Sequence, residues 1–226
     1  MGIDWDGLEM RDYKSVQKDG TTVITRVVDL KVVNSANLSQ DQINSYEASA
    51  TKQITEAFGG SDTKTKTTVK VEVKYTQVAK ADPGKDFYVE FTNELQQPPD
   101  APPLNSNAVA VTDKQGNTET NRMQVTTDGT AQDVGNSITH ELGHAAGLGH
   151  PDDNGGKPIP GNLMNAGGTF GNTPTDLNKD QLKTVSNTIA DNMGKNANPA
   201  ENGKGLAPEL QGAPSKSSNH DNTSDF

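Results

Sequence analysis

The first half of the chain alternates between polar turns and short runs of apolar or β-branched residues, the pattern of a protein with several strands. Residues 68–76 alternate strictly, with three valines and Tyr75 on one side and charged residues on the other, which predicts a half-buried strand. Residues 21–33 are dense in β-branched side chains and predict a longer strand. Further strands are expected around Phe87, Val89 and Phe91, at residues 108–112 and at residues 123–127.

Two segments before residue 150 have the spacing and the caps of helices. Ser39 and Gln42 form a capping box before the first one, which ends at Gly59. Thr130 is the expected cap of a second helix that covers residues 131–146. The expected buried positions of the first helix are Ile43, Tyr46, Ala50, Ile54 and Ala57.

A third helix is expected near the C-terminal end of the ordered part. Asn178 and Gln181 form its capping box, Leu177 and Leu182 are placed as a hydrophobic staple, and Gly194 is the expected stop. Its apolar stripe consists of Leu182, Val185, Ile189 and Met193.

The order of these elements, β-α-β-β-β-β-α-loop-α, predicts an α/β (α+β) fold with one mixed, mostly parallel twisted sheet. Residues 21–194 form the expected domain, and residues 1–20 are expected to be a leader or linker. Residues 195–226 are almost free of apolar periodicity and are expected to be a disordered polar tail. The proline-rich segment 97–103 is expected to be an exposed loop.

Composition narrows the classes of partner. The net charge is −10, so phosphate backbones and anionic membranes would repel the chain, and neither nucleic acid nor membrane insertion is expected. The chain has no cysteine, which excludes disulfides, thiolate metal sites and a cysteine nucleophile. The N-terminus lacks the basic and apolar regions of a signal peptide. The chain is therefore expected to be cytosolic, to leave the cell by another route, or to be part of a longer protein.

The predicted second helix carries the strongest chemical signal. His140 and His144 are four residues apart, so both imidazoles lie on one helix face, at the spacing that suits a tetrahedral zinc ion. Glu141 lies beside them and suits a carboxylate that accepts a proton from water. Gly147 allows the helix to end in a left-handed turn, and only after such a turn can His150 become a third ligand. Three protein ligands leave one open position, as in catalytic zinc sites.

The complete motif is too specific for a chance occurrence. A random chain of this composition would contain it on the order of once in 10⁵ sequences. The opposite helix face is apolar, so one face meets a core and the other a cleft.

The run from His140 to His150 resembles the signature of the metzincin zinc peptidases. That family also places a methionine in a tight turn beneath the zinc, and Met164, in a glycine-containing segment, has the matching position. The resemblance covers residues 21–194 and implies a metzincin-like fold with an active-site helix, a Met-turn and a C-terminal helix. It further implies that the strand Ala108, Val109, Ala110 and Val111 is an edge strand that pairs with an extended substrate, although an ordinary internal strand fits as well.

Several positions differ from familiar members of that family. Some metzincins have a tyrosine ligand two residues after the methionine, whereas this chain has Ala166. Pro151 after the third histidine assigns no subfamily. The acidic residues 152–154 are a candidate calcium loop, but solvated acidic loops are more common.

These features together predict a zinc-dependent endopeptidase with one catalytic Zn²⁺ and a peptide or protein substrate. The short, acidic, leaderless chain also resembles the toxin modules of bacterial polymorphic toxins. That resemblance implies delivery outside the producing cell and, as partners, a preceding part of the chain or a cognate inhibitor. The alternative is a non-enzymatic binding module with a structural metal site, in which Glu141 would have no purpose.

Overall fold

The structure is a computed structural model that describes residues 10–82, 86–96, 110–112, 122–151, 156–165 and 176–195. Within these ranges the chain forms a mixed sheet and three helices, which confirms an α+β fold. The elements are β1 (Met10–Val16), β2 (Thr22–Asn34), α1 (Gln40–Phe58), β3 (Gly60–Asp62), β4 (Thr67–Gln77), β5 (Tyr88–Thr92), β6 (Ala110–Thr112), β7 (Arg122–Thr126), α2 (Ala131–Ala145) and α3 (Lys179–Lys195).

The long strand β2 organises the sheet, whose strand order is β3-β4-β2-β5-β7-β6. Strand β4 pairs with β2 in parallel along eleven register positions, from Thr22 to Val32. Strand β1 pairs antiparallel with residues 22–28 of β2, and β5 pairs in parallel with residues 31–34. The central strands β4, β2, β5 and β7 are thus mutually parallel, as predicted, while the marginal strands β1, β3 and β6 run antiparallel to their neighbours.

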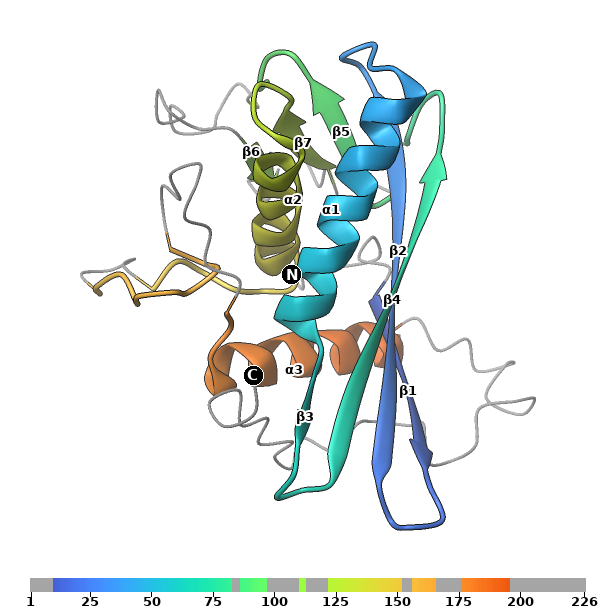
Figure 1. The fold of residues 1–226 in the computed structure, drawn as a ribbon, viewed down its shortest axis with the longest axis vertical. Helices are drawn as coiled ribbons and strands as arrows, with labels where there is room; N and C mark the ends of the chain where they lie inside the picture. Colours follow the sequence, from blue (N-terminus) through green and yellow to red (C-terminus); the bar gives the residue numbers. More distant parts are fainter. Residues whose placement is uncertain are drawn as a thin grey trace.

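Helices α1 and α2 pack on the same face of the sheet and against each other, and α3 crosses below them (Figure 1). The predicted capping box at Ser39 and the predicted cap at Thr130 are present, the latter as a capping box with Asp133, and the predicted apolar positions of α1 are buried. The two helices approach closely at Gly135, where an added Cβ would lie 2.9 Å from the Ala50 backbone nitrogen. A side chain at Gly135 would therefore force α1 and α2 apart.

Strands β1 and β3 and the end of helix α3 differ from the prediction. Strand β1 lies inside the segment predicted as a leader, and β3 follows α1 directly where only a helix stop was expected. The leader prediction is wrong for residues 10–16, because the buried positions of β1 include the charged Asp12, which breaks the apolar alternation. Helix α3 includes Gly194 and ends at Lys195, one residue into the predicted tail. The rest of that tail and the loop 97–103 lie outside the described residues.

Asp12 is buried because it forms an ion pair with Arg26 of β2. The guanidinium donates to both carboxylate oxygens, at 2.9 and 2.8 Å, and the Arg26 side chain is only 2% exposed. Arg26 also donates to the Phe58 carbonyl at the end of α1 and to the Ser186 hydroxyl of α3. The buried Arg26 side chain therefore connects β2 to β1, α1 and α3 through hydrogen bonds.

No helix among the described residues is long and apolar enough to cross a membrane.

Replacement of Asp12 by alanine is expected to lower the free energy of unfolding by about 3–5 kcal/mol, because it leaves a buried guanidinium without its counter-charge. Chemical denaturation measures the loss. The matched control is Arg11→Ala on the same strand, whose pairing with Asp29 is at 3.9 Å and largely exposed. That change is expected to cost less than about 1 kcal/mol. Equal losses in the two variants would contradict the role assigned to the buried pair.

Candidate metal site

Helix α2 ends in the turn that the motif requires. Gly147 has φ +88°, its N–H donates to the His144 carbonyl, and the Leu148 N–H donates to the Gly143 carbonyl. This pair of hydrogen bonds is a Schellman motif, in which a left-handed residue closes the helix and turns the chain. The prediction that Gly147 ends the helix in a left-handed turn is confirmed, and the turn brings His150 back toward the helix.

The three histidines converge on one point. The Nε2 atom of His150 lies 3.2 Å from Nε2 of His140 and 3.1 Å from Nε2 of His144. The candidate ligand atoms of the three residues all lie within 4.8 Å of one another. A tetrahedral zinc ion with Zn–N bonds of about 2.0–2.1 Å has N···N edges of about 3.3–3.4 Å. The observed separations are close to that edge, so the three residues can hold one metal ion.

The other ring nitrogens are engaged by backbone carbonyls. Nδ1 of His140 lies 2.7 Å from the Leu163 oxygen, and Nδ1 of His144 lies 2.8 Å from the Leu148 oxygen. A carbonyl only accepts, so each Nδ1 carries the proton and each Nε2 presents a lone pair. Burial lowers the pKa of His140, against the opposing effect of the Leu163 hydrogen bond. The net lowering of this pKa favours the neutral imidazole, which is the form that binds a metal.

Met164 packs against α2 at Gly143. It is fully buried, and a Cβ added at Gly143 would lie 2.4 Å from its sulfur atom. The turn that carries Met164 begins at Gly161, which has φ +79°. The same turn supplies the Leu163 carbonyl to His140, so residues 161–164 support the histidine face through both packing and a hydrogen bond.

The remaining predicted site residues are placed less completely. Glu141 follows His140 on α2 and is buried, with 6% of its surface exposed. Ala110 and Val111 lie in β6, at the end of the strand order and beside α2, whereas Ala108 and Val109 lie outside the described residues. The candidate calcium loop 152–154 and Ala166 also lie outside them.

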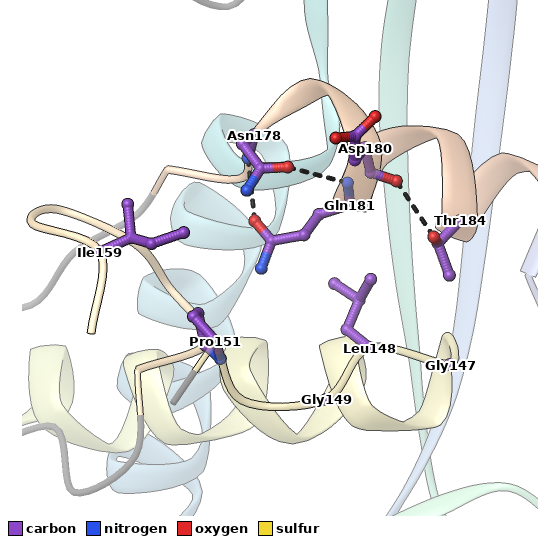
Figure 2. Close-up of a pocket in the computed structure, with 9 residues that line it drawn as sticks. All are labelled: Gly147, Leu148, Gly149, Pro151, Ile159, Asn178, Asp180, Gln181 and Thr184. Atoms are coloured by element: carbon purple, nitrogen blue, oxygen red, sulfur yellow. Dashed lines mark hydrogen bonds between the residues drawn. The ribbon is translucent and has the colours of Figure 1, made fainter. Parts of the chain in front are cut away.

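A cavity of about 330 Å³ lies between the turn after α2 and the first turns of α3. Figure 2 shows Leu148 and Pro151 on one side and the polar side chains of Asn178, Gln181 and Thr184 on the other. None of the three histidines lines it. The cavity is therefore behind the loop that carries His150 and is separate from the convergence point of the ligands.

Sequence reasoning missed the residues that support the ligands. Asn162 and Gln181 form two mutual side-chain hydrogen bonds, and Gly143 provides the space for Met164. Gln181 was recognised only as a helix cap, and Asn162 carried no periodic or motif signal. A glycine inside a helix pattern was the one available sign of a close contact at residue 143.

No protein-family model matches the chain, and no curated protein is significantly similar to it in sequence. The function is therefore inferred from the residues of the site. Their arrangement provides three converging imidazoles, two carbonyls that fix the rings, and a buried carboxylate next to the first ligand.

Zinc is expected to stabilise the folded chain, because the three ligands converge only when the chain is folded. At about a thousand times the dissociation constant, the gain in the free energy of unfolding is expected to be about 4 kcal/mol. Denaturation with and without Zn²⁺ measures it. His150→Ala removes a ligand that lies outside the helix and is expected to lose most of the gain. A parent-like zinc response in that variant would exclude His150 as a ligand.

Gly143→Ala is expected to destabilise the protein by about 1–3 kcal/mol, because the new methyl would lie 2.4 Å from the sulfur of the fully buried Met164. The sign of the change in the free energy of unfolding is informative, because alanine at an uncrowded helix position stabilises the helix by roughly 1 kcal/mol relative to glycine. Chemical denaturation measures the change in the parent and in a Met164→Ala background. The cost is expected to vanish in that background; the same cost in both would contradict the contact.

Proposed function

We propose that the protein is a zinc-dependent endopeptidase related to the metzincins. The observation that carries the proposal is the convergence of His140, His144 and His150, with Nε2 separations of 3.1 and 3.2 Å to His150. Met164 against the helix that bears two of these ligands agrees with the Met-turn of that family. No other described group of His, Cys, Asp or Glu side chains offers a comparable set of three ligand atoms.

The ligand set favours zinc over other common ions. Three neutral imidazoles suit zinc or a neighbouring transition metal, whereas calcium and magnesium prefer oxygen ligands. Three protein ligands leave a position for water or substrate, as in catalytic zinc sites. When bound, a zinc ion supplies Lewis acidity that acidifies water and polarises the carbonyl of the bond to be cleaved.

Glu141 then has the central role among the protein's own groups. It accepts the proton of the attacking water and passes it to the amine nitrogen as the peptide C–N bond breaks. A buried carboxylate is costly to keep in a fold, and a purely structural metal site does not need one beside its first ligand. The burial of Glu141 therefore favours a catalytic site over a structural one.

Strand β6 is the proposed binding edge for the peptide. Among the described residues it pairs only with β7 and ends the strand order, and its other edge is the proposed place for main-chain hydrogen bonds to an extended peptide. Helix α2 packs against β6. An extended peptide added to this edge would lie beside the helix that carries His140 and His144.

The second candidate function is a binding module with a structural metal ion, favoured by the cavity between the turn after α2 and the start of α3, which none of the three histidines lines. Unfolded casein, incubated with and without a chelator, separates the two. Chelator-sensitive cleavage supports the peptidase. Binding of one zinc ion without cleavage of casein or of any member of a peptide library would support the module.

Glu141→Ala is expected to retain zinc but to lose peptide cleavage by at least about a hundredfold, because the proton acceptor is gone while the ligands remain. His144→Ala is expected to lose both. Zinc content by metal analysis and cleavage of a fluorogenic peptide library are measured on the same samples. Glu141→Gln, which preserves the shape of the side chain, controls for packing around the buried carboxylate. Undiminished cleavage by either Glu141 variant would overturn the mechanism.

A further inference from the structure

Asn162 and Gln181 form a reciprocal amide pair between the Met164 turn and helix α3. The Asn162 Nδ2 group donates to Gln181 Oε1 at 2.7 Å, and Gln181 Nε2 donates to Asn162 Oδ1 at 3.0 Å. Asn162 is only 2% exposed and Gln181 is half-buried. Two parallel hydrogen bonds between planar groups fix both distance and orientation, which apolar packing alone does not.

Each acceptor oxygen of the pair also receives a backbone N–H. Asn162 Oδ1 accepts from Met164 N–H at 3.0 Å, which holds the turn in shape. Gln181 Oε1 accepts from Asn178 N–H at 2.9 Å, as half of the capping box of α3. The start of α3 and the turn at residues 162–164 are thus joined through two side chains.

The turn in turn holds a metal ligand. The Leu163 carbonyl accepts a hydrogen bond from His140 Nδ1, and the Leu163 N–H donates to the Asp176 carbonyl just before α3. The peptide groups around Leu163 are therefore fixed from the α3 side by Asp176 and by the amide pair. Any displacement of this turn moves the acceptor that sets the tautomer and direction of the His140 ring.

Figure 2 shows how Gln181 reaches this position. Its side chain extends from the first turn of α3 toward the loop that follows α2, while Asn178 caps the helix above it. Asn178 Oδ1 accepts from the Gln181 N–H at 3.0 Å, and the Asn178 side chain takes no part in the amide pair. The two capping residues therefore share one structural role and differ in their link to the metal site.

We propose that Gln181 and Asn162 are positioning residues of the metal site, which transmit the position of the α3 N-terminus to His140 through the Leu163 carbonyl. This inference rests on the proposed metal site. The capping box of α3 thereby has a second role. Besides starting the helix, it sets the orientation of His140, the first proposed ligand.

The test compares Gln181→Met with Asn178→Ala in the full chain. Both variants remove one hydrogen bond of the capping box, but only Gln181→Met removes the amide pair. Zinc affinity is measured by competition with a chromophoric chelator, and the ligand field by the visible absorption of the Co²⁺-substituted protein. Thermal unfolding of the metal-free variants measures how far each one weakens the fold.

Gln181→Met is expected to raise the zinc dissociation constant about tenfold, the lower end of the effect of outer partners of metal ligands, and to shift the Co²⁺ absorption. Asn178→Ala is expected to stay within about threefold of the parent with an unchanged Co²⁺ spectrum, although the loss of the cap lowers its melting temperature. Should the methionine variant fail to fold, Gln181→Ala replaces it, because alanine is the best helix former.

The outcomes separate the inference from the proposed function. A Gln181 variant that binds zinc as the parent does, or an equal loss of affinity in the Asn178 variant, would overturn the positioning role and leave the metal site intact. Failure of the unaltered chain to bind one equivalent of zinc more tightly than His144→Ala would overturn the metal site, and the positioning role with it.

Discussion

The hydrogen bond from His140 Nδ1 to the Leu163 carbonyl joins two parts of the protein that the chain places 23 residues apart. On one side lies α2, which is fixed by its burial against the sheet and α1, with Gly135 at the closest approach. On the other lies the turn at residues 161–164, which is fixed by α3. The contact of Met164 with Gly143 closes the same interface through packing. The direction of the His140 ring thus depends on how two separately anchored elements meet.

Helix α3 packs on the rest of the protein through an apolar stripe and also makes polar contacts in its first half. Gln181 meets Asn162 at the start of the helix, and Ser186 accepts a hydrogen bond from the buried Arg26. Directional contacts of this kind define one arrangement, because a shift of α3 would leave buried donors and acceptors without partners. The apolar stripe of Leu182, Val185 and Ile189 supplies the burial, while the polar contacts select the position.

Directional hydrogen bonds also orient the two histidines of α2. In His140 and His144, Nδ1 forms a hydrogen bond with a backbone carbonyl, and Nε2 faces the point where the three rings converge. Nε2 of His140 and Nε2 of His144 present lone pairs toward Nε2 of His150 at 3.2 and 3.1 Å, close to the separation of two nitrogen ligands on one zinc ion. The arrangement is therefore understandable as a site shaped for a metal ion, with Glu141 buried beside it and β6 as the nearby sheet edge.

The sequence determined those features that depend on local spacing. The caps at Ser39, Thr130 and Asn178 and the left-handed turn at Gly147 follow from hydrogen bonds and sterics within a few residues, and His140 and His144 share a face because of the helical repeat. Only the tertiary structure decided that Asp12 belongs to a strand, that β1 and β5 share one side of β2, and that Asn162 meets Gln181. These outcomes come from pairs distant in sequence, whose buried polar groups look like surface residues until their partners are in place.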